Sequence, residues 1–468
     1  MKKWSDGQVE RDTLTRERII VLDLGGHGSY LIARRIRQLK VYCEILPFTT
    51  SLQKLLEIKP RGIILAGCLA DRVSHKKVIG CVTTLLDAGI PVLAMGPSLH
   101  WLVGELGGKM EMARVDQGPT IYGTRFDDET IGEPGAKEIL QSFAGQVCGC
   151  QPIWTMESFI EMSIKDIQAE VGDERVVCGL SGGVDSTVAA ALVYRAIGSQ
   201  LTSIFVDHGF MRKHEVEEVT GIFRKRFGDN FIAVDAHERF LERIKGISDP
   251  EMKRKRIGTE FIRVFEEEAA KLGKIEYLVQ GTLYPDVVES GVGEAGLVKS
   301  HHNVGGLPED MSLKLLEPLR WLFKDEVREV AQKLGLPDEL VWRQPFPGPG
   351  LAVRIIGEIT PEKIEILQEA DHILREEIKK AGLEREIWQY FAVLTDTKTV
   401  GVHEQQRTYG YMVGIRAVDS IDGMTASWVP LPYPVLESIS HRIMQEVKVV
   451  NRVVYDISSK PPSTIEWE

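Results

Sequence analysis

The stretch RVVCGLSGGVDSTVAAALVYRAIG, residues 175–198, decides the fold of the middle of this chain. Its first part, VVCGL, is apolar and suits a buried strand, and its last part, STVAAALVYRAI, has the composition of a buried helix. Between them lies a turn of small and polar residues. A strand, a glycine turn and a helix in this order predict one unit of a doubly wound, mainly parallel α/β sheet.

The turn itself predicts a site for phosphate. Small side chains let backbone amides come close to an oxyanion, and the start of the following helix adds a partial positive charge. The turn is not a Walker loop, because no Gly-Lys-Ser/Thr ends it. An ordinary serine-capped glycine turn is the alternative, but a carboxylate and several hydroxyls within one turn favour phosphate binding. The residues of this phosphate loop are Ser181, Gly182, Gly183, Val184, Asp185, Ser186 and Thr187.

Outward from this loop, the chain divides into three predicted domains. Residues 151–345 contain the loop and form one doubly wound, mainly parallel α/β domain, which ends near the Pro- and Gly-rich segment RQPFPGPGLA (343–352). Residues 346–468 predict a small α+β C-terminal domain. Residues 1–150 predict another mainly parallel α/β domain, because apolar strand candidates alternate there with helical or loop segments. These candidates are residues 18–26, 41–47, 62–67 and 90–95.

The composition is that of a globular, multidomain enzyme. The chain has 468 residues, of which 43% are hydrophobic and 27% charged, so it is too long for a single core. Its formal net charge of −11 argues against a general nucleic-acid surface. The sequence shows neither a signal peptide nor an apolar run that could span a membrane, so we expect a cytoplasmic protein without a membrane partner. The six cysteines suit reduced thiols, and Cys148-Gly-Cys150 lacks the further ligands of a metal site.

The phosphate loop resembles the pyrophosphate loop of the ATP pyrophosphatases, which cleave ATP between its α and β phosphates. That superfamily acts on several substrates, but the flanking segments resemble the GMP synthetases in particular. The resemblance extends from about Trp154 to Glu468, and its motifs are specific. They are FVDHGFMRKHE (205–215), DPEMKRKRIGTEFI (249–262), QGTLYPDVVESG (280–291), KSHHNVGGLPEDM (299–311), EPLRWLFKDEVR (317–328), RQPFPGPGLAVR (343–354) and VNRVVYDISSKPPSTIEWE (450–468).

The resemblance implies an AMP-forming ligation. ATP would activate the C2 oxygen of xanthosine monophosphate (XMP) as an adenylyl ester, and ammonia would then displace AMP to give GMP. The phosphate loop would bind the pyrophosphate of ATP, with Asp185 and Lys324 as catalytic residues and Mg²⁺ as the cofactor. Asp207, at the end of the next strand, would face the nucleotide, although a role as a helix cap or turn residue stays open. Asp286 and Glu289 would hold the metal.

By the same resemblance, the residues that would contact XMP are Arg254, Asp371, His403, Lys460, Ile465 and Glu466. Arg254 lies in the basic run KRKR (253–256), for which composition alone favours a solvated face. Asp371 stands beside the apolar stripe of a predicted helix, so its carboxylate needs a partner. The tail around Pro461-Pro462 and Trp467 has the composition of an ordered segment rather than a frayed end.

Residues 17–143 resemble the class I glutamine amidotransferase domain, but their catalytic positions differ from that family. Gly96 stands where the family has its nucleophilic cysteine, and Asp127 and Glu129 stand at the positions of its histidine and glutamate. The segment between GGKMEMARVDQGP and TIYG is also short, which would remove part of the glutamine pocket. Because a nucleophile and its base act as a unit, we expect no glutaminase activity. Ser98 is a weak candidate for a replacement nucleophile.

The sequence leaves two kinds of function open. The chain is either an active synthetase that uses free ammonia or ammonia from a separate glutaminase subunit, or a regulatory pseudoenzyme that binds nucleotide without turnover. The intact phosphate loop and Lys324 favour the synthetase, because a protein that only binds nucleotide has no need for groups that stabilise departing pyrophosphate. The resemblance also implies a homodimer contact in the C-terminal domain.

Overall fold

The computed structural model describes most of the chain, namely residues 14–25, 28–67, 72–96, 98–99, 121–124, 134–289, 313–403, 405–420, 423 and 425–468. By its internal contacts the chain divides into two compact units. The first unit consists of Met1–Gly172, Leu283–Leu297 and Arg320–Lys333. The second unit consists of Asp173–Thr282, Val298–Leu319 and Leu334–Glu468.

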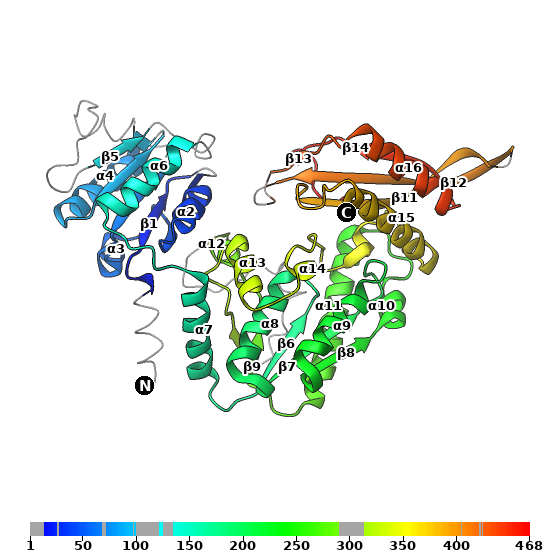
Figure 1. Cartoon of the computed structure of the whole chain (residues 1–468), viewed down its shortest axis with the longest axis horizontal. Coiled ribbons are helices and arrows are strands. Elements are labelled where there is room, and N and C mark those ends of the chain that lie inside the picture. Colours follow the sequence, from blue (N-terminus) through cyan, green and yellow to red (C-terminus); the bar gives the residue numbers. More distant parts are fainter. Residues whose placement is uncertain are drawn as a thin grey trace. The chain divides into compact units, whose positions relative to one another are not determined.

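The first unit contains a five-stranded parallel sheet in the order β2-β1-β3-β4-β5 (Figure 1). The four strands expected from the apolar runs are all present, which confirms the mainly parallel α/β prediction. The strands are β1 (Ile19–Asp23), β2 (Cys43–Pro47), β3 (Gly62–Ala66), β4 (Val92–Met95) and β5 (Ile121–Thr124).

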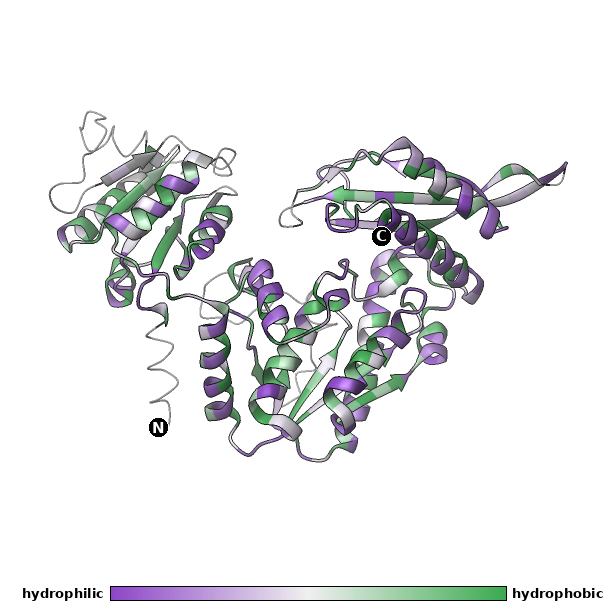
Figure 2. Cartoon of the chain, viewed as in Figure 1, coloured by the Kyte–Doolittle hydropathy of each residue, from purple (hydrophilic) through white to green (hydrophobic). Residues whose placement is uncertain are grey.

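Helices cover both faces of this sheet, because successive side chains of a strand point to opposite sides. Ile19 and Val21 of β1 belong to one buried cluster with residues of α2 (Gly28–Gln38) and α6 (Pro134–Ser142). Ile20 and Leu22 belong to another with residues of α3 (Leu52–Ile58) and α4 (Arg72–Asp87). Figure 2 shows hydrophobic colouring along the strands and mixed colours on the helices. The doubly wound prediction is confirmed for this sheet.

Three further helices belong to the first unit although their positions in the sequence are far apart. They are α7 (Met156–Val171), α12 (Tyr284–Glu289) and α13 (Lys324–Lys333). Thr155 caps α7 by accepting a hydrogen bond from the amide of Ser158. The last two helices therefore leave the sequence-continuous ATP pyrophosphatase segment and pack with the N-terminal part of the chain.

The second unit contains another five-stranded parallel sheet, in the order β10-β9-β6-β7-β8. Its strands are β6 (Val176–Leu180), β7 (Leu201–Asp207), β8 (Phe231–Asp235), β9 (Tyr277–Val279) and β10 (Lys314–Leu316). The chain runs from β6 outward to β8 and then returns to the other side of β6, so the strand order reverses between β6 and β9. Ligands of open α/β sheets bind at the carboxyl ends of the strands at such a reversal. The phosphate loop begins there, directly after β6.

Several helices of the second unit lie between or after these strands in the sequence. They are α8 (Val184–Ile197), α9 (Glu215–Phe227), α10 (His237–Ile244), α11 (Pro250–Lys271) and the short α14 (Asp338–Val341). Asp249 caps the long α11 through a hydrogen bond from the amide of Met252, and Pro250 follows it at the first helical position. Within the described residues, no helix has both the length and the apolar character needed to cross a membrane.

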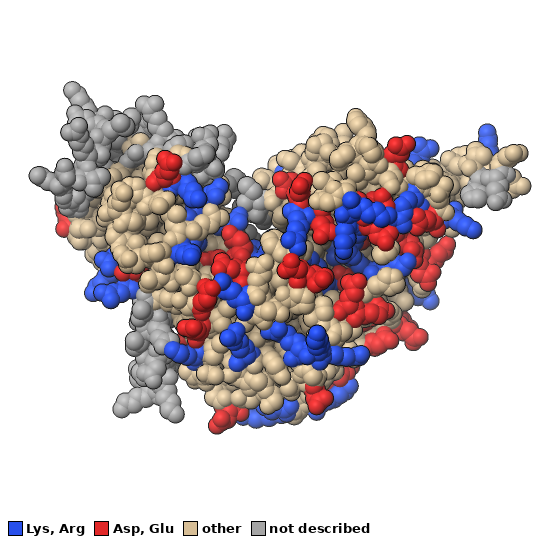
Figure 3. Space-filling view, in the orientation of Figure 1, with Lys and Arg blue, Asp and Glu red and all other residues tan. Residues whose placement is uncertain are grey.

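The C-terminal part of the second unit is an α+β domain, as predicted. Its sheet centres on β12 (Gln406–Asp419), which pairs antiparallel with β11 (Gln389–His403) and β13 (Ser427–Trp428) and parallel with β14 (Val450–Asp456). Its helices are α15 (Pro361–Lys380) and α16 (Tyr433–Glu446). On the face shown in Figure 3, acidic and basic side chains are intermixed.

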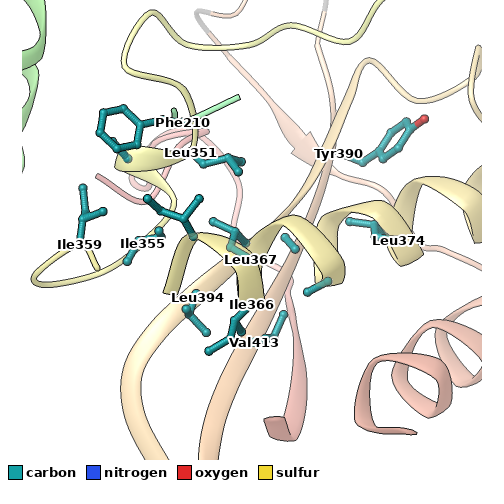
Figure 4. Close-up of a cluster of buried hydrophobic side chains, with 14 of the residues drawn as sticks. Phe210, Leu351, Ile355, Ile359, Ile366, Leu367, Leu374, Tyr390, Leu394 and Val413 are labelled. Carbon is teal, nitrogen blue, oxygen red and sulfur yellow. The ribbon is translucent and has the colours of Figure 1, made fainter. Parts of the chain in front are cut away.

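One hydrophobic core runs from the parallel sheet of the second unit into the C-terminal domain. It includes Ile204 and Phe210 from the parallel-sheet part and Leu367 from α15. Figure 4 shows Leu367 on α15 near Leu394 of β11 and Val413 of β12. This continuous core explains why the parallel sheet and the C-terminal domain form a single compact unit.

We predict that Leu367→Ala lowers the free energy of unfolding by about 2–5 kcal/mol, because Leu367 is fully buried and its truncation leaves a cavity. Urea denaturation followed by circular dichroism measures the change. Leu315→Ala is the matched control in the same unit, because Leu315 is 39% exposed and its loss should cost only about 0.5 kcal/mol. Equal losses for both variants would contradict the central position of α15 in this core.

Candidate active site

The phosphate loop is a tight turn between β6 and α8. Gly182 has a φ of +75°, a conformation that favours glycine, and its carbonyl accepts a hydrogen bond from Nη1 of Arg343. A Cβ atom on Gly182 would lie 2.8 Å from that nitrogen, so a larger residue would displace the guanidinium. Gly183 then precedes the first turn of α8, which places its amide at the positive end of the helix.

The hydroxyls of the loop bond to one another and to the backbone. Ser181 Oγ and Ser186 Oγ lie 3.0 Å apart, and Ser186 Oγ also donates to the carbonyl of Gly183 at 3.2 Å. Thr187 is fully buried, and its hydroxyl donates to the same carbonyl at 2.7 Å. Ser181 and Ser186 are therefore the hydroxyls nearest the loop surface, whereas Thr187 closes the first turn of α8.

Gly281, just after β9, brings a second backbone segment close to the start of α8. A Cβ atom built on Gly281 would lie 3.1 Å from the backbone of Asp185 and Ser186. Asp185 itself lies in the first turn of α8. The reversal of strand order between β6 and β9 thus places the predicted catalytic carboxylate against the neighbouring strand end.

Asp207 is the last residue of β7, and its side chain stabilises the turn that follows, which is one of the two roles considered for it. Its Oδ1 accepts a hydrogen bond from the amide of Gly209 at 3.0 Å. The same oxygen lies 3.0 Å from Nε2 of His237, which sequence reasoning did not single out. The nucleotide-binding role of Asp207 stays a prediction.

A buried charge cluster joins the loop after β7 to the segment before the C-terminal domain. Glu215 accepts from the amide of Arg212 at 2.9 Å, from its Nη1 at 3.2 Å and from Nε of Arg343 at 2.9 Å. Burial opposes the charge of Glu215, but the two guanidinium groups prevail and lower its pKa to about 2. Arg343 carries this cluster to the carbonyl of Gly182. Both motifs that contain these residues were noted in the sequence, but these three residues were not predicted to be important. Their charges beside apolar neighbours could have indicated buried ion pairs.

Asp371 has the buried partners that its position beside the apolar stripe required. Its side chain is 1% exposed, and its Oδ1 accepts from the amide of Ala392 at 3.1 Å. Its Oδ2 lies 3.6 Å from Nε of Arg212, the same arginine that pairs with Glu215. Burial lowers the pKa of Arg212 to about 10, although Glu215 and Asp371 both favour its charged form. The contact with XMP stays a prediction for Asp371.

The C-terminal tail is ordered by buried arginines, as its composition predicted. Glu466 pairs with the guanidinium of Arg354 through two bonds of 2.9 and 2.8 Å, and Arg354 lies 3.9 Å from the centre of the Phe391 ring. Trp467 donates from its indole nitrogen to Asp456 at 2.9 Å. These contacts fix the tail against β11 and β14, since Phe391 and Asp456 belong to those strands.

Three other residues predicted to contact XMP lie on or beside this tail. Lys460 donates to the carbonyl of Gly423 at 2.8 Å, and the carbonyl of Ile465 accepts from Arg416 at 3.4 Å. Arg254, in the first turns of α11, donates to the backbone oxygen of Glu468. The structure therefore brings Arg254, Ile465 and Glu466 into one ordered region, and their substrate role stays a prediction.

Lys324 and Asp286 lie in the first unit. Lys324 is the first residue of α13, and Oδ2 of Asp286 accepts from the amide of Leu283 at 2.9 Å, which stabilises the start of α12. Their assignments to catalysis and to the metal stay predictions. The remaining predicted positions lie outside the described residues or have undescribed side chains: Asp127, Glu129, Glu289 and His403. Among the described residues, no three His, Cys, Asp or Glu side chains gather in a way that could hold a metal ion.

Three family models match separate parts of the chain. The model for glutamine amidotransferase class-I matches residues 20–144, that for NAD synthase matches 156–260, and that for the GMP synthase C terminal domain matches 376–467. A GMP synthase [glutamine-hydrolyzing] from Carboxydothermus hydrogenoformans is 50% identical to this chain, covering 96% of it and 99% of the relative. The chain belongs to the GMP synthase family.

Other relatives carry the same name. A GMP synthase [glutamine-hydrolyzing] from Acetivibrio thermocellus is 48% identical, covering 97% of this chain and 100% of the relative, and one from Heliobacterium modesticaldum is 50% identical, covering 97% and 99%. These alignments extend over 509 to 512 residues, so the relatives carry segments that this chain of 468 residues lacks. Among solved structures, NMN synthetase from Francisella tularensis matches with a TM-score of 0.33 and 15% identity, covering 42% of this chain and 78% of that one.

The amidotransferase-class sheet of this GMP synthase family member has a sharp turn where β4 ends. Gly96 follows β4 with a φ of +55°, which is the kind of strained turn that presents a nucleophile in other enzymes. Ser98 is fully buried, and its Oγ accepts from the amide of Met95 at 3.0 Å and lies 3.1 Å from the carbonyl of Leu65. The Ser98 hydroxyl therefore stabilises the turn from within, which argues against a replacement nucleophile.

We predict that Arg343→Met accelerates backbone hydrogen exchange in the phosphate loop by about tenfold or more, because a charge-assisted hydrogen bond is worth about 1.5–3 kcal/mol. Exchange measured by mass spectrometry on peptides that cover residues 181–187 gives the change. Arg385→Met is the matched control, since Arg385 pairs with Asp338 on the surface and should leave the loop unaffected. Unchanged exchange in Arg343→Met would show that the loop holds its conformation without the charge cluster.

Proposed function

We propose that this chain makes GMP from XMP, ATP and ammonia, with release of AMP and pyrophosphate. The observation that carries the proposal is the complete phosphate loop at the strand-order reversal of a parallel sheet, in a member of the GMP synthase family. Its predicted cytoplasmic location suits the supply of these substrates. The three predicted domains, 1–150, 151–345 and 346–468, divide the work into an amidotransferase-like part, an ATP-cleaving part and an XMP-binding part.

The reaction has two displacement steps. The C2 oxygen of XMP attacks the α-phosphorus of ATP, so the bond to the β-phosphate breaks and pyrophosphate leaves. Ammonia then attacks C2, and AMP leaves with the C2 oxygen. Negative charge develops on the departing pyrophosphate, so the amides of the phosphate loop, the start of α8 and Lys324 would stabilise it. Asp185 would orient the phosphates at the loop, and Asp207 would position the nucleotide.

Asp286 and Glu289 are the residues that we propose for Mg²⁺. Carboxylate oxygens are the ligands that Mg²⁺ prefers, and this ion usually takes one or two carboxylates together with substrate phosphates and water. Asp286 lies in the first turn of α12. Its side chain is a carboxylate, which is the kind of ligand that Mg²⁺ prefers. When bound, Mg²⁺ would neutralise phosphate charge during pyrophosphate departure.

For XMP we propose a site made by Arg254 and the C-terminal domain. The domain residues are Asp371, His403, Lys460, Ile465 and Glu466. The ordered tail supports this assignment, since Glu466 and Ile465 are held by buried arginines and can present the tail in one conformation. A homodimer contact in the same domain is also proposed, and the exposed Val402 and Tyr409 near the β11–β12 turn are suitable apolar groups.

We propose ammonia as the nitrogen source because the resemblance to the class I amidotransferases places a glycine, Gly96, at the position of their nucleophile. Gly96 has no reactive group, and Asp127 stands at the position of the base, with Glu129 retained. Thioester chemistry needs the nucleophile and base together. A separate glutaminase subunit that supplies ammonia is the second candidate. A regulatory pseudoenzyme is the third, and turnover with ammonium salts separates it from both synthetase hypotheses.

We predict that the purified chain makes GMP from XMP, ATP and Mg²⁺ with ammonium salts, but none above background with ammonia-free glutamine. Chromatography of GMP together with a glutamate assay measures both outcomes. Because NH₃ rather than NH₄⁺ is the nucleophile, the rate at subsaturating total ammonium should rise with pH. Gly96→Cys should not restore glutamine use, because the base and part of the pocket are also missing.

Two results would contradict this proposal in different ways. Stoichiometric glutamate and GMP from glutamine would show that the chain is a working glutaminase. Absence of GMP with ammonium in a folded protein that binds ATP would instead favour the regulatory pseudoenzyme.

We predict that Asp185→Asn lowers XMP-dependent pyrophosphate release by about tenfold or more while the protein stays folded, because it removes a charge beside the reacting phosphates. A coupled pyrophosphate assay gives the rate, and a thermal melt checks the fold. Asp229→Asn, on an exposed turn of the same unit, is the control and should act like the unchanged chain. Wild-type turnover in Asp185→Asn would remove Asp185 from the catalytic machinery.

A further inference from the structure

A buried arginine of the amidotransferase-like part holds the helix that carries Lys324. Arg37, on α2, is 4% exposed. Its guanidinium lies 4.3 Å from the ring centre of Tyr42, 4.6 Å from that of Trp154 and 5.5 Å from that of Phe323. Aromatic faces attract a cation, and such an enclosed cation is fixed in place. Its position is therefore set by the sheet and helices of the N-terminal part.

Every nitrogen of this guanidinium donates a hydrogen bond. Nε and Nη2 donate to the carbonyl of Cys43 at 3.0 and 2.9 Å, which anchors Arg37 to β2. Nη1 donates to the carbonyl of Trp321 at 3.2 Å and to both oxygens of Glu326 at 3.2 and 3.3 Å. The arginine thus connects an N-terminal strand with the segment that begins α13.

Glu326 bonds both to Arg37 and to the first turn of α13. Its Oε2 accepts from the amide of Phe323 at 2.8 Å, which satisfies an amide at the helix start in the manner of a capping box. Its Oε1 accepts from the indole nitrogen of Trp154 at 2.6 Å. Lys324 directly follows Phe323, so the direction in which α13 presents Lys324 depends on a carboxylate held by Arg37 and Trp154.

The neighbouring helix α12 is held in the same way. Tyr284 is its first residue, and the hydroxyl of Tyr284 accepts a hydrogen bond from the amide of Ile45 in β2. Its own amide donates to the carbonyl of Leu322 at 3.0 Å, and its ring lies 5.2 Å from that of Phe323. Both α12 and α13 therefore begin at residues fixed by β2 and α2, and between them they carry Lys324, Asp286 and Glu289 (Figure 1).

We propose that the amidotransferase-like part of this chain acts as a positioning element for the synthetase reaction, through Arg37, Glu326 and the start of α13. This inference rests on the proposed GMP synthesis and on the role of Lys324 within it. It gives the N-terminal part a function that needs no glutaminase chemistry. Arg37 and Glu326 are positioning residues, because they act through Lys324 and not on the substrate.

The test is the double variant Arg37→Met/Glu326→Gln. Neither residue is then left as an unpaired buried charge, which is the usual cause of collapse when one partner of a buried pair is removed. The contact with Trp154 does not need the charge of Glu326, since the amide oxygen introduced by Glu326→Gln also accepts from the indole. The link from β2 to the first turn of α13 is nevertheless lost.

We expect kcat for ammonia-dependent GMP synthesis to fall by about tenfold or more, because a small misplacement of a catalytic group has large effects on rate. KM for XMP should stay within about twofold, since the XMP site is proposed elsewhere in the chain. Because loss of folded protein would also lower the apparent kcat without changing KM, kcat is calculated per folded protein, with the folded fraction measured by circular dichroism. Arg34→Met is the matched control: it breaks the 3.2 Å pair of Arg34 with Asp325 between the same two helices and leaves Glu326 untouched.

Arg37→Lys provides a second test should the double variant fail to fold, as judged by circular dichroism. It keeps the buried charge but lacks the planar fork that reaches Cys43 and Glu326 together, so kcat should fall by about fivefold. A folded double variant, or a folded Arg37→Lys, with kcat within about twofold of the unchanged chain would overturn the inference. Failure of the unchanged chain to make GMP would instead refute the proposed function, so the two failures are distinguishable.

Discussion

The second unit depends on the buried carboxylate of Glu215 and the two guanidinium groups that neutralise it. Arg212 comes from the loop after β7, and Arg343 comes from the segment that leads to the C-terminal domain. A buried charge without a partner is costly, so the two guanidinium groups stabilise the charged form of Glu215 in the unit. Through Arg343 the cluster reaches the carbonyl of Gly182, and through Arg212 it reaches Asp371 on α15. The phosphate loop and the C-terminal domain are therefore tied to one electrostatic centre.

The hydrophobic core reinforces this connection. Phe210 and Leu351 belong to the same buried cluster as Leu367 and Leu394, and the amide of Leu351 donates to the carbonyl of Phe210 at 2.7 Å. The Pro- and Gly-rich segment before the C-terminal domain is thus part of the packed core and does not act as a flexible linker. Two domains that the sequence separates at about residue 345 share one core and one charge cluster.

In the first unit, the sharp turn after β4 is formed by a glycine and supported by a buried hydroxyl. Gly96 keeps the left-handed turn after β4, and the hydroxyl of Ser98 bonds to the backbone around it. Elsewhere in this unit, Arg37 of α2 and the edge strand β2 hold the starts of α12 and α13 through hydrogen bonds. Loss of Arg37 would leave Glu326 buried without its cation.

Local sequence pattern was sufficient for β1 to β4, for β6 with the helix that follows it, and for the fold class. The apolar runs that became β1 to β4 and the strand-turn-helix stretch around Ser181 carry their structure in their own composition and spacing, because backbone conformation and side-chain periodicity are local properties. The apolar stripe of α15 likewise predicted that Asp371 would need a partner. Neither the partner, Arg212, nor the cluster of Glu215 and Arg343 could be predicted, because these residues are brought together from loops far apart in the sequence.

The sequence also did not predict that α12 and α13 pack with the N-terminal part. Both helices lie within the stretch that resembles an ATP pyrophosphatase domain, and nothing in their own periodicity indicates which sheet they join. Both helices join the first unit because Arg37 contacts the rings of Trp154 and Tyr284, and Trp154 donates a hydrogen bond to Glu326. These contacts form only in the folded protein. The sequence alone provided a prediction for each residue of the phosphate loop. The contacts that hold the surrounding helices and strands in place required the folded structure, because they join residues far apart in the sequence.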